Sequence, residues 1–144
     1  MTTTQDVLNN LEPYKGMHGL YIITPKNPNV LKEICLKLNY TFKSEIAYIG
    51  KGAKTKSSDL RNRAKQEMGW SNFEGATFVR KMGIFLGFDI TDKTNVQLKE
   101  ETRKFICDNF NIQCIEHPLE DDLLFHEKEL IRKLQPCLND KKNK

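Results

Sequence analysis

Two short apolar segments, each holding a glycine and a tyrosine, constrain the fold most strongly. They read Gly19-Leu20-Tyr21 and Tyr48-Ile49-Gly50. The runs that contain them, residues 18–24 and 45–50, are rich in β-branched and aromatic residues. This composition predicts two short strands. Either segment alone says nothing about function, because such combinations are common in strands.

Apolar spacing predicts helices over most of the remaining chain. Apolar residues recur at helical spacing within residues 4–12, 29–38, 58–68, 77–87, 95–109 and 121–134, and residues 112–116 form a third candidate strand. The loop at 51–58 is rich in lysine and serine. Ser57 or Ser58 can cap the helix that follows, and Gly69 can end it.

Length and composition favour one folded domain, residues 1–144. A chain of 144 residues that is 38% hydrophobic suits an α/β or α+β domain with a single core. No apolar run approaches the roughly 18 residues that span a bilayer. Residues 1–6 lack the basic and apolar regions of a signal peptide. We therefore expect a cytoplasmic protein that does not engage a membrane.

The cysteines and the charges exclude one class of site and leave another open. The spacing of the four cysteines, Cys35, Cys107, Cys114 and Cys137, argues against zinc and favours free thiols in or near the core. The net charge is +4, and basic residues gather in the middle of the chain: Lys43, Lys51, Lys54, Lys56, Arg61, Arg63 and Lys65. Such a cluster suits a phosphate backbone, or it is an ordinary solvated surface.

One carboxylate is out of place in the predicted helix at 121–134. An apolar stripe runs along this helix through Leu123, Leu124, Leu130, Ile131 and Leu134. Glu127 lies three to four residues from four of these positions, so it falls within the stripe. Burial of an unpaired carboxylate costs several kcal/mol or raises its pKa. An ion pair, a metal or a catalytic role is the usual reason to keep one there.

Three further segments complete an ordered set with the two triplets. Gly50-Lys51-Gly52 follows the second triplet, and Asp59-Leu60-x-x-Arg63 opens the basic helix. The chain ends with Glu127-x-x-Leu130-Ile131-x-x-Leu134-x-Pro136-x-Leu138-Asn139. Over roughly residues 16–140, this set resembles the GIY-YIG nuclease domain family. The chain departs from the family pattern in having Leu20 where the first triplet usually has isoleucine.

The resemblance implies an α/β (α+β) fold, with a small central antiparallel three-stranded sheet flanked by helices. The triplets are farther apart than in the tight hairpin of the family. Insertions are therefore expected at about 25–44, where the helix at 29–38 fills the gap, and at about 69–110. Residues 141–144 are expected to be a disordered tail.

The resemblance also implies hydrolysis of DNA phosphodiester bonds with one divalent ion, Mg²⁺ or Mn²⁺. In this chain Glu127 would be the metal ligand and Arg63 would stabilise the transition state. Tyr21 would be the general base, provided that nearby cations lower its pKa, and Tyr48 would hold the nucleophile or the phosphate. The substrate-binding set would be Lys51, Gly50, Arg61 and Asn139, with Gly50 allowing close approach of the backbone and Asn139 bracing the site.

Each residue also has a structural interpretation. Tyr21 and Tyr48 could be core residues of strands, and Arg63 could be a surface arginine, with Arg61 taking its place if the helix register differs. His126 is expected to point away from Glu127, and a site role for His18 or His117 is less favoured. Phe78, Phe85 and Phe88 suit the core better than base stacking.

Three functions compete at this stage. The first is a metal-dependent endonuclease of the GIY-YIG class. The second is a catalytically inactive module that binds nucleic acid through the basic cluster. The third is a structural protein in which Glu127 and Arg63 form only a buried ion pair, so that removing either charge would cost roughly 3–5 kcal/mol of stability. The sequence does not reveal the oligomeric state or the target.

Overall fold

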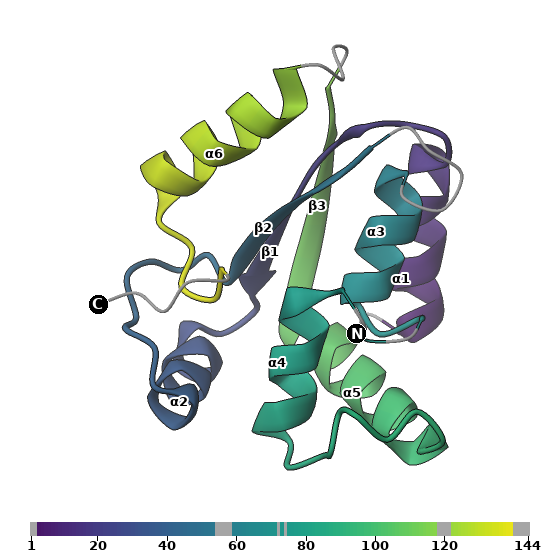
Figure 1. Cartoon of the computed structure of the whole chain (residues 1–144), viewed down its shortest axis with the longest axis vertical. Helices are drawn as coiled ribbons and strands as arrows, with labels where there is room; N and C mark the ends of the chain where they lie inside the picture. Colours follow the sequence, from purple (N-terminus) through teal and green to yellow (C-terminus); the bar gives the residue numbers. More distant parts are fainter. Residues whose placement is uncertain (1–2, 54–58, 72, 74, 118–121, 140–144) are drawn as a thin grey trace.

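A three-stranded antiparallel sheet lies at the centre of the molecule (Figure 1). The computed structural model describes residues 3–53, 59–71, 73, 75–117 and 122–139. Within them the strands are β1 (Gly19–Pro25), β2 (Tyr48–Gly52) and β3 (Phe110–Glu116), in the order β2-β1-β3. The predicted α+β architecture is confirmed, and the second triplet lies on an edge strand.

The strand register brings the two triplets side by side. Tyr21 lies opposite Gly50, and Ile23 lies opposite Tyr48. Because side chains alternate along a strand, Tyr21, Tyr48 and Gly50 belong to one face of the sheet, and Lys51 belongs to the other. The two tyrosines, far apart in the sequence, therefore meet on the same face.

Helices cover both faces of the sheet. Figure 1 shows α1 and α3 on one side and α6 on the other, with α2, α4 and α5 towards one end of the strands. Their bounds are α1 (Thr4–Leu11), α2 (Pro28–Leu38), α3 (Leu60–Glu67), α4 (Thr77–Phe85), α5 (Val96–Asn109) and α6 (Leu123–Leu134), and the short 3₁₀ helix η1 (Glu12–Tyr14) follows α1. Thus α2 occupies the first predicted insertion, and α4 and α5 lie in the second.

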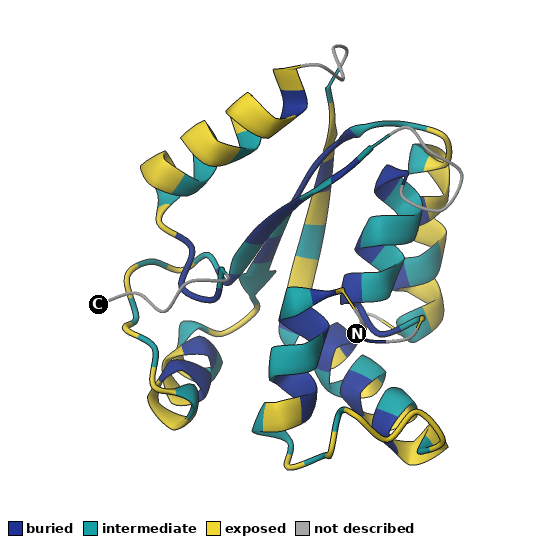
Figure 2. Cartoon of the chain, viewed as in Figure 1, coloured by how far each residue is buried: buried dark blue, intermediate teal, exposed yellow. Residues whose placement is uncertain are grey.

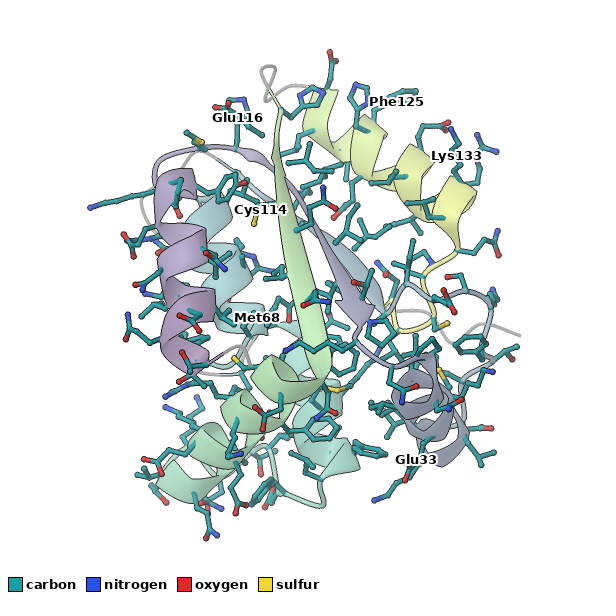
Figure 3. The ribbon with its side chains drawn as sticks, turned by 180° about the vertical axis from the view of Figure 1, so that it is seen from behind. Glu33, Met68, Cys114, Glu116, Phe125 and Lys133 are labelled. Carbon is teal, nitrogen blue, oxygen red and sulfur yellow. The ribbon has the colours of Figure 1, made fainter. Side chains whose placement is uncertain are left out.

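The core lies between the sheet and the helices α1 to α5 (Figure 2). Tyr21, Phe78 and Phe110 are among its largest fully buried side chains, and the rings of the two phenylalanines meet edge to face at 5.2 Å. Seen from behind, Cys114 lies on the side of β3 nearest α1 and α3 (Figure 3). None of the four cysteines forms a disulfide and all four are buried, as predicted.

The apolar stripe predicted for α6 is only partly correct. Leu123 is buried, Leu130 and Ile131 are half-buried, and Leu124 is 50% exposed. Phe125 also extends into solvent from this helix (Figure 3). Helix α6 packs against β2 and β1. Because it meets the outer face of a narrow sheet, it buries a strip narrower than the one predicted.

The segment between β2 and α3 differs from its prediction at both ends. Lys51 and Gly52 continue β2 instead of opening a loop. Asp59 caps α3, because its Oδ1 accepts a hydrogen bond from the Asn62 backbone N–H at 2.7 Å. Its Oδ2 accepts another from Gly16 N–H at 2.9 Å. The predicted caps Ser57 and Ser58 lie outside the described residues.

Two other expectations from the sequence concern the C-terminal tail and membrane crossing. The predicted tail at 141–144 lies outside the described residues. Within the described part of the chain, none of the helices combines the length and the apolar character that a membrane crossing requires.

Candidate active site

A cleft of about 390 Å³ lies beside the edge strand β2. Helix α3 contributes to it from one face of the sheet, and α6 contributes from the other. Its lining consists of Tyr21, Tyr48, Gly50, Lys51, Ala53, Arg63 and Glu127. The structure thus brings together six of the eight predicted site residues, from four separate elements. The other two, Arg61 and Asn139, do not line this cleft.

Gly50 makes room for Tyr21. A Cβ atom built on Gly50 would overlap Cζ and Oη of Tyr21. The structure gives a steric reason for glycine here, because the end of the Tyr21 phenol occupies the space that a side chain would need. That Gly50 lets the protein backbone approach the substrate closely stays a prediction. The second triplet ends in glycine because the first ends in tyrosine.

The Tyr21 hydroxyl donates a hydrogen bond to Glu67 Oε2 at 3.0 Å. Glu67 is fully buried at the end of α3, one turn after Arg63. Its other oxygen, Oε1, accepts hydrogen bonds from the backbone N–H groups of Phe78 at 3.0 Å and Val79 at 3.2 Å. Sequence analysis missed Glu67, although Leu60, Ala64 and Met68 already marked its side of the helix as buried. Like Glu127, Glu67 is a carboxylate within an apolar stripe of a helix, and such a position calls for an ion pair, a metal or a catalytic role.

The electrostatic environment of Tyr21 is opposite to the one expected. Burial raises the pKa of its phenol well above the ordinary value, and the charge of Glu67 raises it further. Arg63 acts in the other direction but is outweighed. Burial and the charge of Glu67 thus raise the pKa of Tyr21, whereas the sequence led us to expect that nearby cations lower it.

Tyr48 is half-buried next to Tyr21, with 6.2 Å between the ring centroids. Burial is also the main cause that raises its pKa, and the charges of Glu67 and Glu127 act in the same direction. A side-chain hydrogen bond with Thr77, at the start of α4, opposes them. Tyr48 is therefore a neutral phenol that can donate or accept a hydrogen bond at the cleft.

The two candidate arginines of α3 have different surroundings. Arg63 lines the cleft, and its guanidinium donates hydrogen bonds to Gln66 Oε1 at 3.0 Å and to the Gly75 carbonyl at 3.5 Å. Arg61 instead forms an ion pair with Glu12 of η1 at 3.1 Å. The structure therefore supports the register that directs Arg63 to the site, and it gives Arg61 a role in holding η1 to α3.

Glu127 is half-buried on α6, in a cleft that is also lined by the charged side chains of Lys51 and Arg63. Burial raises the pKa of its carboxyl, while Lys51, Arg63 and Lys128 lower it in part. Among the described residues, no salt bridge joins Glu127 to Arg63, so the purely structural ion pair is not observed.

The donor set suits a hard cation with few protein ligands. No group of three histidine, cysteine or acidic side chains gathers for a metal in the described ranges. Mg²⁺ keeps several waters and takes one or two carboxylates together with phosphate oxygens. Glu127 in an open cleft fits that pattern, because a partly desolvated carboxylate gains from a nearby cation.

Asn139 braces the outer edge of β2. Its Oδ1 accepts a hydrogen bond from the Ile49 N–H at 3.1 Å, and its Nδ2 donates to the Ile49 carbonyl at 2.9 Å. The side-chain amide thus pairs with the free edge of the sheet as a neighbouring strand would. Its predicted bracing contact is present, and both ends of the amide are engaged by the protein.

Replacing Asn139 with alanine is expected to lower the free energy of unfolding by about 1–3 kcal/mol, because two backbone groups of Ile49 lose their partner. Urea denaturation measures the change. Asn111, an exposed asparagine on β3, provides the matched control variant Asn111→Ala, which should change stability much less. Equal stability of Asn139→Ala and the wild type would contradict the bracing role.

The remaining candidates lie elsewhere. His126 faces His117, with ring centroids 4.4 Å apart, and neither lines the cleft. His18 does not line it either. Phe78 is fully buried, while Phe85 and Phe88 pack against the core, as predicted.

Comparison with known proteins agrees with this geometry. The family model for the GIY-YIG catalytic domain matches residues 19–144. No curated protein and no solved structure matches the chain. The match includes both triplets, the Arg63 helix and the Glu127 helix, which together form the cleft. The chain therefore belongs to the GIY-YIG catalytic domain family, which indicates a nuclease-type function on a nucleic-acid substrate.

Proposed function

We propose that this protein is a divalent-metal-dependent endonuclease that hydrolyses DNA phosphodiester bonds in the cleft beside β2. One observation carries the proposal. Two phenols, an arginine, a lysine and a half-buried carboxylate from four elements line a single open cleft. This set combines cations for a phosphate, a carboxylate for a metal and hydroxyl groups for a water.

The cations of the cleft suit a phosphodiester. Lys51 and Arg63 both line the cleft and supply positive charge to it. Arginine remains charged, and its planar fork matches phosphate oxygens, so Arg63 is the better group to stabilise charge that develops at phosphorus. Lys51 would contribute to binding as a point charge.

Glu127 is the residue that would hold the ion. When bound, Mg²⁺ or Mn²⁺ would polarise the phosphate oxygen and stabilise the leaving oxygen. One ion suits this cleft because, among the described residues that line it, Glu127 is the carboxylate. Tyr48 would orient the phosphate or the attacking water through its hydroxyl, and Tyr21 lies beside it to accept a hydrogen bond from that water.

The cysteines bear on the cellular location. None of the four forms a disulfide, which supports a reducing compartment, and we infer a cytoplasmic location.

The test is cleavage of supercoiled plasmid in buffer containing Mg²⁺ or Mn²⁺, with an EDTA control for each. Nicked or linear product only in the presence of metal is the expected result. Branched DNA and RNA are run in parallel to define the substrate. Binding of these nucleic acids without cleavage in any metal would contradict the proposal and favour an inactive binding module.

Substituting Gly50→Ala should reduce cleavage by roughly 10²-fold, because the new methyl group displaces the Tyr21 hydroxyl and small displacements of catalytic groups have effects of this size. The rate of plasmid nicking measures the loss. Overpacking also costs about 1–3 kcal/mol, so the rates are compared at a temperature where circular dichroism shows both proteins folded. Wild-type cutting by a folded Gly50→Ala protein would contradict the steric role.

A further inference from the structure

Glu67 is a charged side chain that the proposed chemistry does not yet use. It is fully buried, and its carboxylate joins α3, which carries it, to two other elements: β1 through Tyr21, and the start of α4 through two backbone N–H groups. Burial of a carboxylate is costly unless it is hydrogen-bonded. Retaining it in the core therefore calls for a reason.

The contacts of the two carboxylate oxygens are different. Oε1 caps α4, whose own N-cap residue, Ala76, has no side chain that can accept a hydrogen bond. That contact is structural. Oε2 accepts a hydrogen bond from the hydroxyl group of Tyr21, a residue that also lines the cleft. A helix cap alone would not require this second contact.

The direction of this hydrogen bond decides what Tyr21 can do. A carboxylate has no proton to give, so the phenolic O–H must donate to Oε2. The remaining hydrogen-bonding capacity of Tyr21 Oη is then that of an acceptor, and the fully buried Tyr21 side chain lies in the lining of the cleft.

We propose that Glu67 is a positioning residue that holds the Tyr21 hydroxyl as an acceptor for the attacking water and receives its proton during cleavage. This inference rests on the proposed nuclease function. The proton moves in two linked transfers. As the water oxygen bonds to phosphorus, its proton passes to Tyr21 Oη, and the phenolic proton passes to Glu67 Oε2. The leaving oxygen takes the electron pair of the broken P–O bond and then a proton from solvent.

The charges around this pair support a linked transfer. Burial raises the pKa of Glu67, which improves it as a proton acceptor. The hydrogen bonds from α4 and Tyr21 and the charge of Arg63 oppose that shift only in part. Burial and the charges of Glu67 and Tyr48 also raise the pKa of Tyr21, while Arg63 lowers it in part, so the phenol gains from passing its proton on as it receives one.

The substitution Glu67→Gln separates the cap from the positioning role. The amide oxygen can still accept from Phe78 and Val79, so the amide nitrogen faces Tyr21 and donates to its oxygen. The hydrogen bond is thereby reversed while the shape is kept. We expect kcat for plasmid or oligonucleotide cleavage to fall by roughly 10²–10³-fold, as for loss of a general base, with little change in KM. The melting temperature at pH 8 should be equal or higher, since an uncharged group replaces a buried charge.

A double-mutant cycle with Tyr21→Phe shows whether Glu67 acts through Tyr21. The double variant is expected to lose no more activity than the more damaged single variant, because both changes disable one unit. Multiplied losses, or wild-type kcat in Glu67→Gln, would overturn the inference. If the wild type cuts and Glu127→Gln does not, the proposed nuclease function still stands whatever the result at Glu67. Absence of cleavage by the wild type would overturn both proposals.

A second variant keeps the test valid if Glu67→Gln fails to fold. In Glu67→Met/Ala76→Ser, methionine fills the volume and the serine hydroxyl caps α4 from its own N-cap position. If Glu67 serves only as a cap, this protein regains wild-type cutting, which overturns the inference. If Glu67 positions Tyr21, the protein folds and remains slow.

Discussion

Replacing Glu127 with glutamine is expected to reduce DNA cleavage by at least roughly 10³-fold, about 4 kcal/mol in activation free energy. Glutamine keeps the size of the side chain but loses the charge that holds a divalent ion. Among the described residues that line the cleft, Glu127 is the carboxylate, so none of the others is expected to offset the loss. The measurement is the initial rate of plasmid nicking over a series of Mg²⁺ concentrations.

The matched control is Glu129→Gln, the same chemical change on the same helix. Glu129 pairs with Arg132 at 2.8 Å, its side chain is 47% exposed, and it does not line the cleft. It should cut at the wild-type rate. Glu127→Gln should melt no lower than the wild type at pH 8. Burial raises the Glu127 pKa, so the folded state binds a proton more readily than the unfolded state, and this stabilising contribution is lost as pH rises. Cleavage by Glu127→Gln at the wild-type rate would remove the metal assignment.

Replacing Arg63 with alanine is expected to reduce cleavage by about 10²–10³-fold, as when a group that stabilises transition-state charge is removed. The effect on stability should be small, because the described contacts of Arg63 are hydrogen bonds to Gln66 and to the Gly75 carbonyl at the margin of the cleft. Single-turnover cleavage of a labelled duplex measures the chemical step separately from binding.

Arg63→Lys refines this test. Lysine keeps the positive charge but lacks the planar fork, so an intermediate rate is expected. Arg61→Ala tests the alternative helix register directly, because Arg61 is paired with Glu12 outside the cleft. If Arg61→Ala abolished cleavage while Arg63→Ala did not, the catalytic assignment would pass to Arg61.

The ordered pattern along the chain was enough to predict most of this site. The two triplets predicted strands, and the 3.6-residue spacing of apolar residues predicted the helices that carry Arg63 and Glu127. These features are local, because strand and helix periodicity are properties of neighbouring residues. The exposed face of α6 was mispredicted because its burial depends on how much of the sheet lies beneath it.

The role of Glu67 could not be assigned in the same way. Helical spacing from Leu60 and Ala64 could have placed it on a buried face, but its hydrogen-bond partners come from β1 and α4, on either side of it in the sequence. The reason for glycine at position 50 was likewise hidden, because it depends on strand register and on the direction of the Tyr21 ring.

The sequence by itself determined the elements, the family motif and the residue types that suit phosphodiester chemistry. Only the tertiary structure decided that Tyr21 is a buried hydrogen-bond donor to Glu67, that Arg63 and not Arg61 reaches the cleft, and that Asn139 engages the sheet edge. The physical reason is that periodicity fixes which face a side chain occupies. Burial, pKa and hydrogen-bond direction depend on the segments that pack against that face.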